Sequence, residues 1–424
     1  MFEQGLMAML SVATDPYLLF LIFVTTILGV VIGVLPGLGA TTGAALLLPF
    51  TLTMDPVHAI AVLATIYVSA TFAGSITAIL INTPGTSAAA ATTFDGYPLA
   101  QKGEAGRALG IAVISSTVGG VFSVIVLCFA APLLARVAYE FRSPEYFALT
   151  VFGLSMLASI SAGGAVKNLI GGIFGVWLST IGAERVTGIE RFMFGNYELY
   201  EGIHFVPIFI GLFAISELLV QSKTVNKIVN TVRMKAVKLP TKEDYKKIWK
   251  TILRSCGIGT FIGVLPAEGA TVASMIGYSE ARRWSKNKEE FGKGSIEGIA
   301  GAEAANNSAT GGAMVPTMVL GIPGSGTTAI ILVGLMVHGL RPGVYLFTEQ
   351  VEKVYQIFGS MFFANIMFML MGLYAAKFFA RVSLVPTAIL WPIVFGLSVI
   401  GAYAFQGQLL DVWLALIFGV IGFF

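Results

Sequence analysis

The chain has 424 residues and a formal net charge of +3. Hydrophobic residues make up 56% of it and charged residues 12%, and the mean hydropathy is +0.83. This composition excludes a water-soluble globular domain and indicates a polytopic membrane protein. The net charge is too small to suggest a nucleic-acid-binding protein. The two cysteines, Cys128 and Cys256, stand apart in apolar runs and predict neither a disulfide framework nor a metal site.

A membrane-spanning helix needs about 20 predominantly apolar residues. The clearest candidates are Tyr17–Leu35, Val57–Ile81, Gly110–Leu134, Ile203–Val220 and Phe358–Phe379. With weaker segments, we expect an all-α fold of roughly ten to twelve transmembrane or re-entrant segments. No Lys or Arg precedes Lys102, so the first apolar segment lacks the basic start of a signal peptide and should remain as a span. The chain ends within the apolar run 414–424, which predicts that the natural protein continues.

A glycine-rich phrase occurs twice along the chain. GVLPGLGAT at Gly33–Thr41 returns as GVLPAEGAT at Gly263–Thr271. Each copy is followed by Ser-Ala-Thr, beginning at Ser69 and at Ser308, and then by a Pro-Gly phrase, NTPGTS or GIPGSG. Three matches in the same order indicate an internal repeat.

We predict two halves, residues 1–220 and 255–424, joined by a basic cytoplasmic linker at 221–254. Each half should hold one helical break and one hairpin. They lie at 33–43 and 82–100 in the first half, and at 263–271 and 321–339 in the second. Lys and Arg flank the second phrase but not the first, and basic residues mark cytoplasmic loops. This distribution of Lys and Arg predicts that the two repeats have opposite orientations in the membrane and that the N-terminus lies outside. The linker could also bind anionic lipid or nucleic acid. A cytoplasmic loop whose basic residues follow the positive-inside rule is the simpler interpretation.

Broken helices survive in a membrane only where they are buried in protein or line a wet cavity. There, freed carbonyls can ligate a small cation, and half-helix N-termini can hold a carboxylate. We therefore expect facing breaks to form one site near the membrane midplane. The residues predicted to bind substrate are Asn82, Thr83, Pro84, Gly85, Thr86, Ser87, Asn306, Asn307, Pro323, Gly324, Ser325, Gly326 and Thr327. Those predicted to hold the coupling ion are Gly33, Pro36, Gly39, Thr41, Gly263, Pro266, Glu268, Gly269, Thr271 and Glu303.

Each of these assignments has an alternative. Small and hydroxyl residues also fill helix–helix contacts in membranes, so packing competes with binding for any single Ser or Thr. The asparagine amides we interpret as functional, because amides are costly at depth in a bilayer. Asp95 and Glu217 lie either at depth or near an interface. Glu268 and Glu303 could carry a coupling proton or counter a sodium ion, and sodium is the only metal ion expected.

Enzyme motifs do not fit the chain. The glycines of GLGATTG miss the dinucleotide-binding spacing, and in GIPGSGTT Thr327 stands where a phosphate-binding loop needs lysine. The three histidines are scattered. We therefore expect no enzyme activity and no cofactor other than the coupling ion, Na⁺ or H⁺.

Five stretches together resemble one known family, the large permease subunit of the tripartite tricarboxylate transporters, the TctA family. They are GVLPGLGATTGAALLLPFTLTMDPVHAI, NTPGTSAAAATTFDGYPLAQKGEAGRAL, SPEYFALTVFGL, FGNYELYEGIHFVPIFIGLFAISELL and EAANNSATGGAMVPTMVLGIPGSGTTAIILVGLMVHGLRPG. The resemblance covers essentially the whole chain. It departs at Pro266–Gly269, which reads Pro-Ala-Glu-Gly where the family commonly has Pro-Gly-Ala-Gly.

The resemblance implies a permease in the bacterial inner membrane, working with a small membrane subunit and a periplasmic solute-binding protein. It implies uptake of di- or tricarboxylates such as citrate, or of related organic acids, driven by a sodium or proton gradient, with an elevator-like movement. A passive organic-anion channel is the alternative and would share the broken helices. An intramembrane enzyme would need a nucleophile and base at depth, and a receptor subunit would have no use for two broken helices.

Overall fold

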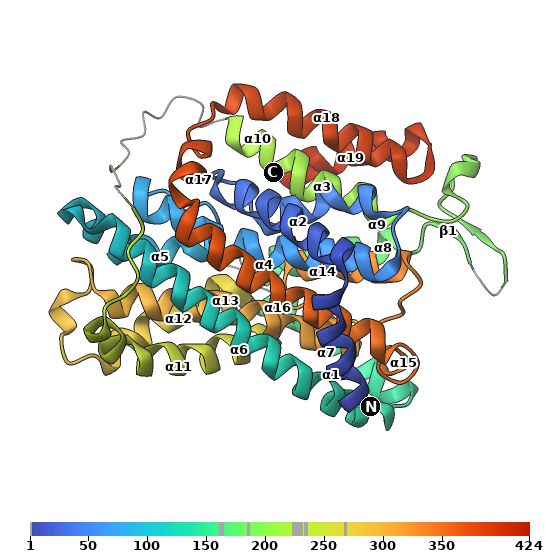
Figure 1. Ribbon diagram of the computed structural model, residues 1–424. Coiled ribbons are helices and arrows are strands. Elements are labelled where there is room, and N and C mark those ends of the chain that lie inside the picture. Colours follow the sequence, from blue (N-terminus) through green and yellow to red (C-terminus); the bar gives the residue numbers. More distant parts are fainter. Residues whose placement is uncertain (1, 161–164, 185–186, 223–231, 233–235, 267–268) are drawn as a thin grey trace.

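The computed structural model describes residues 2–160, 165–184, 187–222, 232, 236–266 and 269–424. These residues are almost entirely helical, apart from two-residue strands β1 (Gly182–Ala183) and β2 (Glu190–Arg191), which pair antiparallel in a projecting loop (Figure 1). Within the described residues, six helical stretches are long and apolar enough to cross a membrane, and four shorter apolar helices accompany them. The predicted all-α polytopic membrane fold is confirmed.

Among the described residues, the first half begins with six α-helices. They are α1 (Phe2–Ser11), α2 (Pro16–Val34), α3 (Ala40–Thr51), α4 (Pro56–Ile81), α5 (Ala90–Leu99) and α6 (Ala105–Tyr139). An Asp-Pro pair starts both α2 and α4: the carboxylates of Asp15 and Asp55 accept hydrogen bonds from backbone N–H groups of the first turn, where proline needs no donor. A 3₁₀ turn, η2 (Ser87–Ala89), leads into α5, and a π-helical segment, η3 (Ala100–Glu104), joins α5 to α6.

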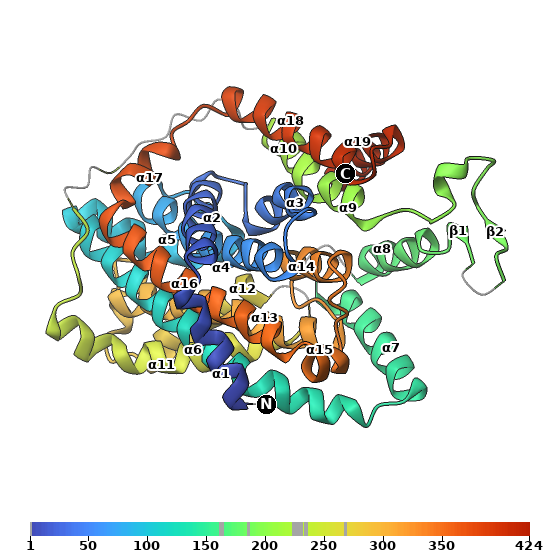
Figure 2. The same cartoon turned by 45° about the vertical axis from the view of Figure 1, so that its right-hand side comes forward.

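The rest of the first half follows and ends with α10 at Ser222. It comprises α7 (Ser143–Ile160), α8 (Ala165–Leu178), α9 (Phe205–Phe209), the π-helical η5 (Ile210–Ile215) and α10 (Ser216–Ser222). In Figure 2, α7, α8 and the strands extend away from the main body. Helix α10 lies beside the first break. A Cβ atom on Gly37, whose φ is +86°, would overlap the side chains of Glu217 and Gln221, so this turn of the first break requires glycine.

The second half contains the remaining helices. It comprises α11 (Lys242–Val264), α12 (Gly269–Trp284), α13 (Ile296–Leu320), α14 (Gly326–Val337), α15 (Val344–Glu349), α16 (Val351–Tyr374), α17 (Ala376–Val382), α18 (Thr387–Gln406) and α19 (Leu409–Phe423). Helix α11 begins inside the range predicted as linker, because Thr241 and Asp244 form a capping box there. The predicted span Phe358–Phe379 is not one helix, since α16 ends at Tyr374.

Helices α4 and α13 form the centre of the molecule (Figures 1 and 2), and nearly all their side chains are buried. Helix α2 packs on α4 as α11 packs on α13, while α6 crosses to α13 and α16 crosses to α4. Matching glycines make these approaches possible. A Cβ on Gly33 would overlap the carbonyl oxygen of Ala70, and one on Gly263 would overlap that of Ala309. The two repeats therefore pack in the same way.

Candidate substrate and ion site

The helices are interrupted at the two repeated phrases. Helix α2 ends at Val34 and α3 starts only at Ala40, while α11 ends at Val264 and α12 starts at Gly269. Helices α4 and α13 both end in a left-handed residue just before the Pro-Gly phrases, Asn82 with φ of 54° and Gly321 with φ of 68°. Among the described residues, helices therefore end within both repeated phrases and just before both Pro-Gly phrases.

A cavity of about 170 Å³ lies where these interruptions meet. Residues at the N-terminal ends of α3, α12, α14 and the η2–α5 segment line it, and two residues of α4 complete its wall. Its lining residues are Gly39, Ala40, Thr41, Tyr67, Thr71, Thr86, Ser87, Ala88, Gly269, Ala270, Thr271, Ser325, Gly326 and Thr327. The cavity therefore combines residues predicted for substrate with residues predicted for the coupling ion.

Two hydroxyl pairs join the halves across the cavity. Thr41 Oγ1, in the first break, lies 2.8 Å from Thr327 Oγ1 in the second hairpin. Ser87 Oγ, in the first hairpin, lies 3.1 Å from Thr271 Oγ1 in the second break. Thr41 and Thr271 hold the same position in the repeated phrase. Each break is thus paired with the hairpin of the other half.

The cavity offers hydrogen-bond donors. The first N–H groups of a helix have no partner within the helix, and the N-terminal end carries partial positive charge. At α3 and at η2 no side chain caps these groups, and Thr86 Oγ1 has no hydrogen-bond partner among the described residues. None of the described lining residues is charged. An arrangement of this kind can bind an anionic group without a basic side chain.

The carbonyl end of α2 lies beside these donors. A Cβ atom on Gly85 would overlap the carbonyl oxygen of Gly33, the last turn of α2. The Gly85 N–H donates to the Gly74 carbonyl at 3.3 Å, and the equivalent Gly324 N–H donates to Thr317 Oγ1 at 3.3 Å. Closely approached carbonyl and hydroxyl oxygens of this type suit a small hard cation such as sodium.

Several predicted site residues lie outside the cavity wall. Asn82 and Thr83 lie at the end of α4, and Asn82 is exposed. Asn306 and Asn307 are fully buried in α13, and the Asn306 side chain donates to the backbone carbonyl of Thr71 at 3.4 Å. The remaining predicted residues outside the wall lie in or next to the breaks and turns. They are Gly33, Pro36, Pro84, Gly85, Gly263, Pro266, Pro323 and Gly324.

The acidic candidates occupy different environments. Glu303 is fully buried and accepts hydrogen bonds from Thr92 and Ser116, away from the cavity wall. Asp95 is also buried, and its carboxylate accepts from the N–H groups of Gly294 and Ser295 at the start of α13. The side chain of Gln221 donates to Glu217 at 3.2 Å. Glu268 lies outside the described residues.

Two polar wall residues were not predicted from the sequence. Tyr67 and Thr71 face the cavity from α4, and Ser325 donates to the Tyr67 hydroxyl at 3.4 Å. Thr71 carries a signal, because it ends the repeated Ser-Ala-Thr phrase. Tyr67 carries none, because it is one aromatic residue within a long apolar run.

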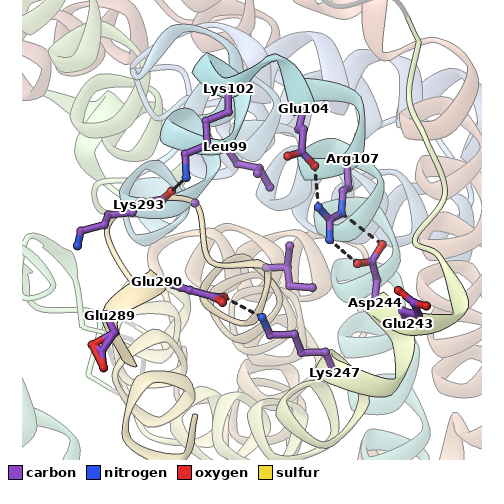
Figure 3. Close-up of a pocket in the computed structure, with 12 residues that line it drawn as sticks. Leu99, Lys102, Glu104, Arg107, Glu243, Asp244, Lys247, Glu289, Glu290 and Lys293 are labelled. Atoms are coloured by element: carbon purple, nitrogen blue, oxygen red, sulfur yellow. Dashed lines mark hydrogen bonds and ion pairs between the residues drawn. The ribbon is translucent and has the colours of Figure 1, made fainter. Parts of the chain in front are cut away.

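A second, charged cavity of about 550 Å³ lies between the start of α6, the start of α11 and the 3₁₀ turn η6 (Lys288–Glu290). Figure 3 shows its central charges paired. Arg107 contacts Glu104 and Asp244 at 2.6 Å each, and Lys247 contacts Glu290 at 2.7 Å. Because these charges neutralise one another across α6, α11 and η6, the cavity is a better candidate for a structural junction than for a substrate site.

Interrupted helices around a polar cavity in a multi-pass bundle are typical of membrane transporters. The chain belongs to the tripartite tricarboxylate transporter TctA family, and the sequence model of that family matches residues 19–424. It is 39% identical over 403 residues to the Agrobacterium vitis "Uncharacterized 52.8 kDa protein in TAR-I ttuC' 3'region", covering 95% of this chain and 80% of that protein. It is 33% identical over 165 residues to the "Uncharacterized protein in TAR-II ttuC' 3'region" of the same organism, covering 39% of this chain and 68% of that protein. No solved structure matches the chain.

Proposed function

We propose that the chain is the permease subunit of a secondary active transporter that imports carboxylates. The observation that carries this proposal is the uncharged cavity at which helix N-termini of both halves converge. Half-helix N-termini hold anionic substrate groups in transporters with broken helices, and nearby carbonyls hold the coupling cation. Di- and tricarboxylates such as citrate are the substrate class, and a sodium or proton gradient drives their uptake.

The transport cycle follows from the pairing of the halves. The carboxylate enters the cavity from outside, and its charge is offset by the helix ends and by a cation at the carbonyl end of α2. Opening to the inside then requires the Thr41–Thr327 and Ser87–Thr271 contacts to separate or to move together. We propose that they move together, as in an elevator, because both pairs tie a break to the opposite hairpin.

Membership of the TctA family supports an assembly of this chain with two other subunits. Tripartite transporters contain a small membrane subunit and a periplasmic solute-binding protein, and we propose both as partners of this chain. We propose that the chain lies in the bacterial inner membrane with its N-terminus outside.

Uptake of radiolabelled citrate and succinate into proteoliposomes containing all three components tests the proposal. We expect accumulation above the external concentration under an imposed sodium or proton gradient, and its collapse when an ionophore removes that gradient. A passive organic-anion channel, the second candidate, would equilibrate the acid without a gradient. Absence of flux with a broad set of carboxylates would contradict both candidates.

A further inference from the structure

Glu303 is a buried carboxyl group at the junction of the two halves. It lies in α13, and it is 0% exposed. Thr92 on α5 donates a hydrogen bond to Oε1, and Ser116 on α6 donates to Oε2 at 2.7 Å. Among the described residues, no basic side chain forms an ion pair with it. An ionised carboxylate without a counter-charge is costly at membrane depth, so this environment favours the neutral acid.

The helices around Glu303 carry other titratable or charged groups. They include Tyr67 on α4, Asp95 on α5, Arg107 on α6, Arg254 and Cys256 on α11, and Tyr278, Glu280, Arg282 and Arg283 on α12. Several are held elsewhere: Arg107 by Glu104 and Asp244, Arg254 over the ring of Trp284, and Glu280 by Arg283. The Asp95 side chain accepts hydrogen bonds from the backbone N–H groups of Gly294 and Ser295.

The hydroxyl partners suit a carboxyl group that changes charge. A Thr or Ser hydroxyl can donate to a carboxylate, and it can also accept the proton of a neutral acid. Thr92 and Ser116 can therefore hold Glu303 in either state. Because both hydroxyls belong to the first half and Glu303 to the second, gain or loss of the proton changes the hydrogen bonding between the halves.

Two buried amides connect Glu303 with the cavity. Asn307 lies one helical turn along α13, about 5.4 Å, and its Nδ2 donates to the Glu303 backbone carbonyl at 3.3 Å. Asn306 donates to the carbonyl of Thr71, a cavity wall residue. The Oδ1 atoms of both amides have no hydrogen-bond partner among the described residues. A buried amide oxygen normally accepts a hydrogen bond. The two Oδ1 atoms are therefore free to accept a hydrogen bond from a proton donor that passes between Glu303 and the cavity.

We propose that Glu303 is the proton carrier of the transport cycle and that uptake is coupled to a proton. The proton passes from water to a Glu303 carboxyl oxygen, converting –COO⁻ to –COOH, and returns to water when the cavity opens to the other side. Asn306 and Asn307 line its route, and Thr92 and Ser116 hold the group in both states. This inference rests on the proposed transport function and specifies its driving ion.

Infrared spectroscopy tests the proton site without any substrate. The full chain in lipid, in its complex with its partner subunits, should show at neutral pH the C=O stretch of a buried protonated carboxyl group. We expect Glu303→Gln to remove that band and Glu297→Gln to leave it, because Glu297 also lies on α13 but accepts a hydrogen bond from Ser285 near the helix start. If Glu303→Gln fails to fold, Thr92→Val should shift the band. A spectrum unchanged in the folded Glu303→Gln variant, or in Thr92→Val, overturns the proposal.

A transport measurement tests the coupling. In proteoliposomes, Glu303→Gln should retain exchange of labelled for unlabelled citrate or succinate but lose accumulation driven by a pH gradient, while Glu297→Gln retains both. Accumulation by Glu303→Gln at the wild-type level under the pH gradient overturns the inference. Failure of the wild-type protein to exchange or accumulate any carboxylate overturns the proposed function instead, whatever the infrared spectrum shows.

Discussion

At the scale of single residues, the two hydroxyl pairs are the most specific feature of the cavity. Thr41→Val keeps the shape of the side chain but removes the hydrogen bond to Thr327 and one polar group from the wall. A lost hydrogen bond is worth about 1 kcal/mol, so we expect the rate of carboxylate uptake to fall roughly five- to tenfold. Uptake by proteoliposomes at a fixed gradient measures the change.

The matched controls lie on the same helix. Thr41→Ser keeps the hydroxyl and should restore most of the uptake. Thr51→Val removes a hydroxyl at the opposite end of α3, where it bonds only to the Leu48 carbonyl of its own helix, and should leave uptake near the wild-type level. Equal uptake by Thr41→Val and Thr51→Val would contradict a role for the Thr41–Thr327 pair.

At the scale of elements, glycines set how closely paired helices approach. A Cβ atom on Gly259 of α11 would overlap the Ser308 hydroxyl and the Ala305 carbonyl of α13. Gly259→Ala should therefore destabilise the fold by about 1–3 kcal/mol, as overpacking does. The apparent melting temperature in detergent measures this loss. Gly29 contacts Ser69 in the same way in the first half, so Gly29→Ala should have the same effect.

Helix α11 provides its own control for this prediction. Gly257 lies two residues from Gly259 and has no atom within 4 Å of an added Cβ. Gly257→Ala should be neutral or should raise the melting temperature, since alanine favours a helix by up to about 1 kcal/mol over glycine. A drop of equal size in both variants would show that general helix effects, and not close packing, set the result.

At the scale of the whole molecule, Arg107 and Asp244 tie the start of α6 to the start of α11 (Figure 3). Burial acts to raise the pKa of Asp244, but the hydrogen bonds from Arg107 and Thr241 outweigh it, and the pKa is lowered from its ordinary value. A lowered pKa in the folded state means that the pair stabilises the fold above the ordinary aspartate pKa of about 3.9. That contribution is lost as the pH falls through the lower, folded-state pKa.

Asp244→Asn should accordingly lower the apparent melting temperature at neutral pH. The difference from the wild-type protein should shrink as the pH falls below about 4 and vanish once Asp244 is protonated. Glu243→Gln, an exposed neighbour, should leave the melting temperature nearly unchanged at every pH. A difference between Asp244→Asn and wild type that persists undiminished in acid would show that the pair contributes through packing rather than through charge.

The local features of this protein could be predicted from its sequence. Apolar length determines spans such as α2, α4 and α6, because a bilayer requires about 20 apolar residues. Proline and glycine determine the breaks before α3 and α12, because both residues disfavour a continuing helix. The repeated phrases also predicted that Thr41, Thr271 and the Pro-Gly turns form one site, and Thr41 and Thr271 line the same cavity.

The tertiary structure alone decided which of these parts meet. Thr41 pairs with Thr327 and not with the hairpin of its own half, because α3 and α14 pack together only after the two halves combine. Tyr67 joins the wall and Asn82 does not, since rotation about a helix axis and the direction of a turn depend on packing against distant helices. Glu303 likewise acquires its partners from α5 and α6, nearly 200 residues or more away in the chain. The spacing of residues in the sequence determines where helices form and where they break. Contacts between residues so far apart in the chain depend instead on how the surfaces of whole helices pack together.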